Sequence, residues 1–179
     1  SHHVVELSSF QLETIKKFNP NISVILNLSK DHLDRYKNIK NYIIAKKNIL
    51  NNGINNINLI SIDDIYSNRI FLNKKIKNKI SFSTKKMTAD ICYKNDYIID
   101  NYFHKNKKIK LSNLSLDLKN SYNLQNILVA FIVCKYFKIP IKYFHESIKC
   151  FKGLPYRSLT IYDSKSKLII NNSKATNIS

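Results

Sequence analysis

Three side chains that can bind a metal ion or a cationic group lie close to two apolar segments. Glu6 lies within Val4–Leu7, and Asp31 and His32 come soon after Ile22–Leu28. Parallel strands end at one edge of a sheet, where α/β proteins bind their ligands. Simpler interpretations exist, with Glu6 as the cap of a following helix and His32 as a structural histidine. The functional alternative is a metal site in which Glu6 or His32 is a ligand and the aspartates orient the imidazole. Residue types and spacing alone leave both interpretations open.

Lys46 falls inside the apolar stripe of a helix predicted over residues 38–52. At about 100° per residue, it points between Ile39, Ile43 and Ile49. One interpretation is a lysine whose stem packs while its ammonium reaches water. The other is an amine held in a site with a lowered pKa, which makes it nucleophilic and able to react with CO2. The resulting carbamate would be an anionic metal ligand.

Polar residues with binding potential recur in the last third of the chain. Asn123 and Asn126 share a face at the start of a predicted helix, where they either cap it or bind the polar edge of a ligand. Arg157 follows a proline closely and suits a phosphate, with a solvated surface arginine as the alternative. Residues 171–177 mix hydroxyl, amide and ammonium groups, a composition suited to an anion.

The elements that carry these residues alternate in the order of an α/β fold. Apolar strands are predicted over 4–7, 22–28 and 55–61, with helices over 9–18 and 38–52 between them. Ser8 and Gln11 have the spacing of a capping box at the start of the first helix. This order predicts a mainly parallel sheet flanked by helices.

The rest of the chain predicts a different organisation. Residues 68–118 alternate short β-type runs with Lys/Asn turns, which predicts a small, partly antiparallel β insertion. Two helices, over 122–137 and 141–151, follow on either side of Pro140. Gly153-Leu154-Pro155 predicts a linker, and a hairpin is predicted over 158–163 and 167–171. We therefore expect one domain over 1–153 and the start of another over 154–179.

Composition excludes several classes of protein. The 179 residues are 44% hydrophobic, too apolar for a disordered chain. No segment has the pattern of a secretory signal or the length of a membrane helix. The three cysteines lack CxxC spacing, which favours a reducing cytosol over a disulfide framework.

The net charge of +18 comes from 30 Lys+Arg against 12 Asp+Glu. Its lysines are dispersed, in a chain rich in the residues of A/T-rich codons. We therefore expect neither a nucleic-acid nor a membrane partner, and a non-catalytic basic binding module remains the alternative.

Taken in chain order, these segments resemble the Mur ligases. Phe10-Gln11 and the Ser-Lys-Ala-Thr-Asn segment at 173–177 are most similar to the branch that adds D-glutamate to UDP-N-acetylmuramoyl-L-alanine. Another Mur-type ligase or a folylpolyglutamate-type ligase is the alternative within this chemistry. The matching segments are Val5–Leu12, Leu26–Leu28, Asp31–Arg35, Lys46, Tyr122–Asn126, Gly153–Arg157 and Asn172–Asn177.

The resemblance implies a fold and a reaction. The fold would be the Mur ligase central domain with its nucleotide-binding sheet, followed by the first strands of a Rossmann-like C-terminal domain. The reaction would be ATP-dependent amide-bond formation through an acyl phosphate, in cytoplasmic peptidoglycan synthesis. ATP, two Mg²⁺ ions and a carbamylated Lys46 would be the cofactors, and the full-length enzyme would be a monomer acting on UDP-N-acetylmuramoyl-L-alanine and D-glutamate.

The resemblance also implies residue roles, with Lys46, His32, Lys174 and Thr176 as the catalytic group. Glu6 would hold Mg²⁺ beside the ATP phosphates, and His32 and carbamylated Lys46 would hold a second Mg²⁺. Lys174 and Thr176 would face phosphate and the incoming glutamate. Two further groups of residues would contact ligands. The nucleotide would be contacted by Asn123, Asn126, Arg157 and Asn172, and the UDP-sugar substrate by Ser8, Gln11 and Asp31.

The chain departs from the family pattern in several places. Tyr122 replaces a His, Tyr156 replaces another, and Asn172 replaces an Asp, so that hydrogen bonding is kept at Asn172 but charge is lost. No Gly-x-x-Gly-Lys phosphate loop occurs within the 179 residues, whose only glycines are Gly53 and Gly153. We therefore expect most of a central domain that does not catalyse the ligation by itself.

Overall fold

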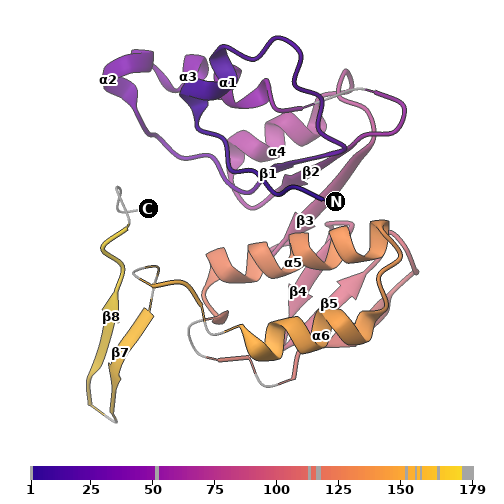
Figure 1. Cartoon of the computed structure of the whole chain (residues 1–179), viewed down its shortest axis with the longest axis vertical. Coiled ribbons are helices and arrows are strands. Elements are labelled where there is room, and N and C mark those ends of the chain that lie inside the picture. The colour runs from indigo at the N-terminus through magenta and orange to yellow at the C-terminus, as the bar shows by residue number, and fades with distance from the viewer. Residues whose placement is uncertain are drawn as a thin grey trace. The chain divides into compact units, whose positions relative to one another are not determined.

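The computed structural model describes residues 2–50, 53–112, 114, 115, 118–151, 153–155, 157, 159–164 and 166–174. In this part of the chain, a six-stranded mixed sheet has the strand order β1-β2-β3-β4-β5-β6, and a two-stranded hairpin is separate from it (Figure 1). The predicted α/β class is confirmed. The chain divides into two compact units, residues 1–81 and 82–179.

Two parallel strands and four helices make up most of the first unit. Strand β1 (Ile22–Ile25) pairs in parallel with β2 (Ile57–Ser61), so that Ile25 lies opposite Ile60. Helix α1 packs beside α3, and α4 packs on β2 (Figure 1). The helices are α1 (Ser9–Glu13), α2 (Leu33–Tyr36), α3 (Ile39–Lys47) and α4 (Ile65–Leu72).

The core of the first unit joins the strands to α2, α3 and α4. Leu59, Ile60 and Ser61 of β2 are fully buried, as expected for an interior strand of a parallel sheet. Tyr36 and Tyr42 are the aromatic members of the core, and both belong to helices near the predicted site. The cluster consists of Ile25, Leu28, Tyr36, Tyr42, Ala45, Ile60, Ile70 and Ile76.

The predicted strand over 4–7 is wrong. Val4 and Val5 are 102% and 57% exposed, and residues 2–8 form no strand. In the described part of the chain β1 is an edge strand of the sheet and pairs only with β2. A strand requires a neighbour that takes up its backbone hydrogen bonds, so an apolar pattern alone does not produce one.

The first helix is shorter than predicted. It ends at Glu13 instead of Phe18, and Thr14 is its C-cap. Lys16, Lys17 and Phe18 are exposed, so further turns would bury no apolar face. The strands over 22–28 and 55–61 and the helix over 38–52 are confirmed with shorter bounds, whereas α2 and α4 were not predicted.

The second unit contains the later strands, two long helices and the hairpin. Strand β3 (Lys79–Ser83) crosses the boundary and pairs in parallel with β4 (Ile91–Lys94). Antiparallel pairing joins β4 to β5 (Tyr97–Asp100) and β5 to β6 (Lys107–Lys110). The predicted strands between 68 and 118 therefore form, and they continue the same sheet.

Helices and the hairpin of the second unit match their predictions. Helix α5 (Ser121–Tyr136) packs on β4, and α6 (Ile141–Cys150) packs on α5. Gly153 has a positive φ of 87°, which fits the predicted linker. Strands β7 (Leu159–Asp163) and β8 (Leu168–Asn171) form the antiparallel hairpin.

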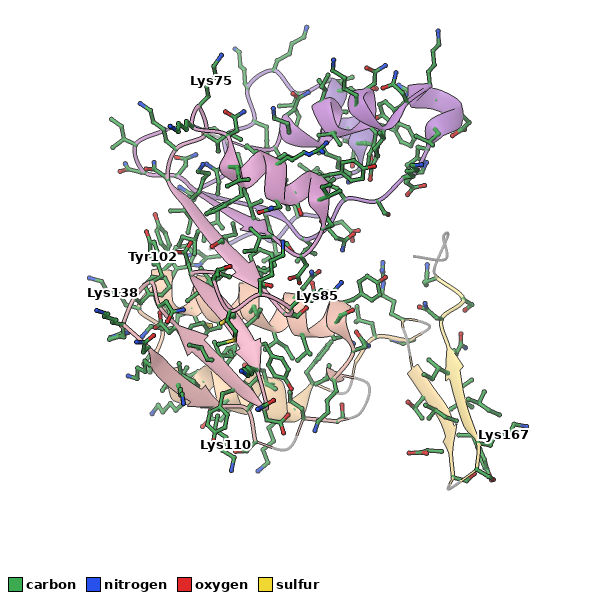
Figure 2. The ribbon with its side chains drawn as sticks, turned by 180° about the vertical axis from the view of Figure 1, so that it is seen from behind. Lys75, Lys85, Tyr102, Lys110, Lys138 and Lys167 are labelled. Atoms are coloured by element: carbon green, nitrogen blue, oxygen red, sulfur yellow. The ribbon has the colours of Figure 1, made fainter. Side chains whose placement is uncertain are left out.

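Lysines are spread over many elements. Lys107, Lys108 and Lys110 are exposed on β6, an edge strand of the described sheet, whereas Ile109 between them is buried. Figure 2 shows Lys75, Lys138 and Lys167 projecting from three other segments. The positive charge is thus not gathered on one element. In the described part of the chain, no helix combines the length and apolarity that crossing a membrane requires.

The Asp64 carboxylate connects the end of β1 to the start of α4. It accepts hydrogen bonds from the backbone N–H groups of Tyr66 and Ser67, both at 2.8 Å, and from the Ser67 hydroxyl. Its second oxygen also accepts the Leu28 N–H at 3.1 Å. One side chain therefore caps a helix and fixes the segment that leads to Asp31 and His32.

Replacing Asp64 with alanine is expected to lower the free energy of unfolding by about 2 kcal/mol, because an N-cap and a partly buried N–H lose their acceptor together. Urea unfolding followed by circular dichroism measures the change. Asp64→Asn is expected to lose less, since its single amide oxygen can still cap α4 although its NH2 group cannot accept the Leu28 N–H. A loss below about 0.5 kcal/mol for Asp64→Ala would contradict the role.

Candidate functional site

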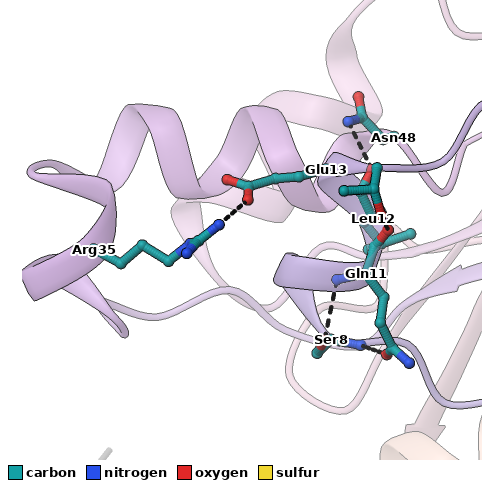
Figure 3. Close-up of polar contacts among 7 residues, drawn as sticks. Ser8, Gln11, Leu12, Glu13, Arg35 and Asn48 are labelled. Atoms are coloured by element: carbon teal, nitrogen blue, oxygen red, sulfur yellow. Dashed lines mark hydrogen bonds and ion pairs between the residues drawn. The ribbon is translucent and has the colours of Figure 1, made fainter.

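The start of α1 is fixed by the predicted capping box. The Ser8 N–H donates to Gln11 Oε1 at 2.8 Å, and the Gln11 N–H donates to Ser8 Oγ at 3.2 Å (Figure 3). Two backbone donors of the helix start are satisfied in this way. Both side chains are exposed, so they remain able to contact a ligand, but their first role here is to end the coil that carries Glu6.

Asp31 and His32 lie in the loop between β1 and α2. The His32 backbone N–H donates to Asp31 Oδ1 at 2.8 Å, and His32 Nε2 lies 3.5 Å from Asp31 Oδ2. His32 has a left-handed backbone, with φ 50° and ψ 34°, and is the N-cap of α2 without a side-chain capping bond. This conformation is unfavourable by about 1–2 kcal/mol for a residue with a Cβ, so the surrounding contacts must hold it.

Lys46 lies on α3 and points toward the segment before α1. Its Nζ donates to the Leu7 carbonyl at 3.5 Å and lies 6.0 Å from the centre of the Tyr42 ring. Burial lowers the pKa of Lys46, while the negative charges of Glu6 and Asp31 act in the opposite direction. The half-buried amine is therefore closer to its neutral, nucleophilic form than an ordinary lysine.

These residues line one pocket of about 390 Å³ in the first unit. Six of the sequence-predicted site residues meet there: Glu6, Ser8, Gln11, Asp31, His32 and Lys46. Two carboxylates, an imidazole and an amine line the pocket. Asp31 and His32 belong to the loop that comes after the carboxyl end of β1. Leu7, Ser9 and Tyr42 complete the lining.

Tyr42 is a lining residue with a functional group that residue types and spacing did not identify. Its ring lies among the apolar residues of α3 and is buried, with 7% of its surface exposed. Burial raises the pKa of its hydroxyl, and the nearby Asp31 adds to this effect. Its position four residues before Lys46 puts it on the same helix face, a signal that would have identified it.

The unmodified side chains do not form a complete metal site. In the part of the chain that the structure describes, no three His, Cys, Asp or Glu side chains lie close enough to share a metal ion. The donor types nevertheless suit Mg²⁺ in part, since carboxylate oxygens are among its preferred ligands. A further oxygen donor on Lys46 would extend this set.

The remaining predicted residues belong to the second unit. Asn120, not Asn123 or Asn126, caps α5, because its Oδ1 accepts the Asn123 N–H at 2.8 Å. Asn123 is half-buried near the helix start, and Asn126 is exposed. Arg157, Asn172 and Lys174 are also exposed, and Thr176 lies outside the described residues.

The lowered pKa of Lys46 can be measured from its side-chain carbon shifts during an NMR titration. We expect a midpoint below the ordinary value of 10.5 and a further decrease in Glu6→Gln, because one charge that favours the ammonium is removed. Asp34→Asn, in α2, is the control, because Asp34 is not among the charges that raise the pKa of Lys46. A midpoint at or above 10.5 in the unaltered chain would contradict the lowered pKa and show that the carboxylates outweigh burial.

The same shift predicts how stability depends on pH. Because the folded pKa is lowered, the unfolded chain binds more protons between the two pKa values. The contribution of Lys46 to stability therefore increases as pH rises through that interval. Urea unfolding across alkaline pH should show a smaller increase in Lys46→Met than in the unaltered chain, and equal slopes would refute the linkage.

Comparisons with known proteins agree on one family. The family model described as Mur ligase middle domain matches residues 1–134. A UDP-N-acetylmuramoylalanine--D-glutamate ligase of Rickettsia bellii (strain RML369-C) is 38% identical over 181 residues, covering 98% of this chain and 40% of the relative. The ligase of the same name from Staphylococcus aureus (strain MSSA476) is 34% identical over 175 residues, covering 97% and 37%. The chain thus spans about two fifths of the length of these curated relatives.

Solved structures show the same fold at lower identity. A UDP-N-acetylmuramoyl-L-alanyl-D-glutamate--2,6-diaminopimelate ligase superposes with a TM-score of 0.65 and 20% identity, over 92% of this chain and 35% of that one. The MurF ligase of Thermotoga maritima in complex with ADP gives a TM-score of 0.60 and 20% identity, over 86% and 35%. At these identities the likeness concerns the fold alone.

Proposed function

The chain belongs to the Mur ligase family through the family's middle domain, and we propose that it supplies the ATP-binding part of a ligase that joins D-glutamate to UDP-N-acetylmuramoyl-L-alanine. Two curated relatives with 38% and 34% identity carry the name of that ligase. One observation of the structure carries the proposal: the half-buried Lys46 amine shares a pocket with Glu6, Asp31 and His32. In this proposal residues 1–153 form the central domain, and residues 154–179 begin the C-terminal domain.

The reaction explains why such a pocket is needed. A carboxylate is a poor electrophile, so ATP must first phosphorylate the carboxylate of the substrate. The neutral amine of D-glutamate then attacks the acyl carbon, a C–N bond forms as the C–O bond to phosphate breaks, phosphate leaves with the bonding electron pair, and the nitrogen releases a proton to solvent. Both reactants are anionic, and positive groups must neutralise charge as it develops. The enzyme acts on soluble nucleotides, and we propose that it does so in the cytoplasm as a monomer.

Carbamylation of Lys46 is the central chemical step in the preparation of the site. The neutral amine attacks CO2, a C–N bond forms, and one proton is released to solvent, which leaves a carbamate with one negative charge. The lowered pKa of Lys46 favours this reaction because it increases the neutral fraction of the amine. The carbamate N–H remains able to donate to the Leu7 carbonyl, which the amine contacts at 3.5 Å.

Glu6 would hold one Mg²⁺ beside the ATP phosphates, and His32 and the carbamate of Lys46 would hold a second. Bound Mg²⁺ supplies positive charge against the phosphate oxygens. Asp31 stays beside the imidazole, where its carboxylate orients the ring, as second partners of ligand histidines do. Ser8 and Gln11 at the pocket wall would contact the UDP-sugar substrate.

The second unit would contribute the nucleotide contacts. Asn123 and Asn126 would lie at the nucleotide with Asn172, and Arg157 at its terminal phosphate. Lys174 and Thr176 would face phosphate and the incoming glutamate. Exposure of Arg157 and Lys174 is compatible with this role, since both need to reach a ligand.

The carbamate can be detected directly. In the chain equilibrated with ¹³C-bicarbonate, we expect one carbamate carbonyl signal in the carbon NMR spectrum that disappears in Lys46→Arg and persists in Lys47→Arg. The matched lysine next to Lys46 controls for general reaction of surface amines. A signal that survives in Lys46→Arg, or that is absent at saturating bicarbonate, would contradict the carbamate.

The ligase reaction is tested with the protein expressed from its own gene. We expect phosphate release that requires both UDP-N-acetylmuramoyl-L-alanine and D-glutamate, with L-glutamate, D-alanine and diaminopimelate as the competing amino acids. Loss of a metal ligand in His32→Ala is expected to reduce the rate at least about 100-fold, since loss of an outer-shell partner of a ligand alone costs about 10- to 100-fold. Release that prefers another amino acid would assign a different ligase of the family.

A further inference from the structure

Four aromatic rings of the first unit form a closed cycle that includes His32. The ring centre of Phe10 lies 5.0 Å from that of His32 and 6.1 Å from that of Tyr36, to which it is stacked at 5°. Tyr42 closes the cycle, 6.4 Å from His32 and 5.6 Å from Tyr36. Three hydrophobic rings therefore limit the orientations open to the imidazole.

Phe10 is the least protected of the three rings that surround the His32 imidazole. Tyr36 and Tyr42 are 5% and 7% exposed, whereas Phe10 is 38% exposed and lies on α1, a helix of five residues. So short a helix is not stable on its own. The position of Phe10 therefore depends on contacts that attach α1 to its neighbours.

Arg35 of α2 makes two of these contacts. Its guanidinium carbon lies 4.8 Å from the centre of the Phe10 ring. Its Nη2 lies 2.7 Å from Glu13 Oε2, the ion pair drawn in Figure 3. Phe10 and Glu13 are three residues apart, and so they occupy the same face of α1. Arg35 thus covers the ring and holds the helix that carries it.

A third attachment comes from α3. Asn48, at the end of α3, donates its side-chain N–H to the Leu12 carbonyl at 3.0 Å, which satisfies a carbonyl at the end of α1 (Figure 3). This bond fixes α1 to α3 but does not touch the aromatic cycle. The contacts that connect α1 to His32 are therefore those of Phe10 with the imidazole and of Arg35 with Phe10 and Glu13.

We propose that Arg35 is a positioning residue that acts through Phe10 to hold the His32 imidazole at the wall of the pocket. The left-handed backbone of His32 and its lack of a capping bond leave ring packing as its main restraint besides Asp31. The importance of this restraint for catalysis rests on the proposed function, in which His32 is a metal ligand. The restraint itself does not depend on it.

The test measures the imidazole signals of His32 in the 179-residue chain labelled at histidine. The signals are assigned by their loss in His32→Gln and are expected to be shifted by the ring currents of Phe10 and Tyr42, away from those of the exposed His2 and His3. In Arg35→Gln we expect most of this shift to disappear while the circular dichroism spectrum is unchanged. Arg69→Gln removes an exposed arginine on α4 and is the matched control.

Two further variants separate positioning from a general structural effect. Arg35→Lys keeps the charge but not the planar group over the ring, and is expected to restore part of the shift. Phe10→Leu is expected to reproduce Arg35→Gln, and the double variant Phe10→Leu/Arg35→Gln should add nothing to Phe10→Leu alone. If Arg35→Gln fails to fold, Arg35→Lys and Glu13→Gln give the same comparison in milder form.

Unmoved His32 signals in Arg35→Gln, or in both milder variants, would overturn the proposal. So would additive shifts in the double variant. The measurement uses no nucleotide, CO2 or metal ion. Failure of the carbamate or ligase experiments would therefore reject the proposed function and leave this result intact, and the reverse also holds.

Discussion

The hydrogen bond from Lys46 to the Leu7 carbonyl joins the two segments from which the pocket is built. Residues 2–8 have no strand to hold them, and α1 has only five residues, so neither is stable without α3. The ammonium in turn is half-buried, and in the described part of the chain it forms no ion pair with a carboxylate within 4 Å. The bond therefore gives the Leu7 carbonyl a donor and gives the partly desolvated Lys46 amine an acceptor.

Two opposing effects of different origin, desolvation and attraction to carboxylates, set the pKa of Lys46. Burial favours the neutral amine, whereas Glu6 and Asp31 favour the ammonium. Both carboxylates are also the groups that a divalent cation would neutralise. A cation bound there would remove their support for the ammonium, so that metal binding and loss of the lysine proton would promote each other.

Much of the pocket could be predicted from residue types and spacing, because Asp31, His32 and Lys46 are placed by local elements that form as expected. The absence of the strand predicted over 4–7 could not be foreseen, because a strand forms only beside a neighbour that the local sequence does not specify. Tyr42 was concealed by its apolar neighbours on α3. The Arg35–Phe10 contact could not be predicted from the sequence. It joins α1 to α2, and no periodic apolar pattern predicts a helix as short as α2. The contacts of Asn123, Asn126, Arg157, Asn172, Lys174 and Thr176 with ligands remain predictions.

Strand β6 presents unpaired backbone groups at one edge of the described sheet, together with three exposed lysines. Such an edge would otherwise offer a template for a strand of a second molecule. Like charges on two approaching edges repel each other, and this repulsion is long-ranged only while salt is dilute. The solubility of the protein should therefore depend on ionic strength. In low salt, repulsion between the β6 lysines keeps the edges of two molecules apart. Association of these edges is expected once salt shortens the screening length to less than the length of a lysine side chain.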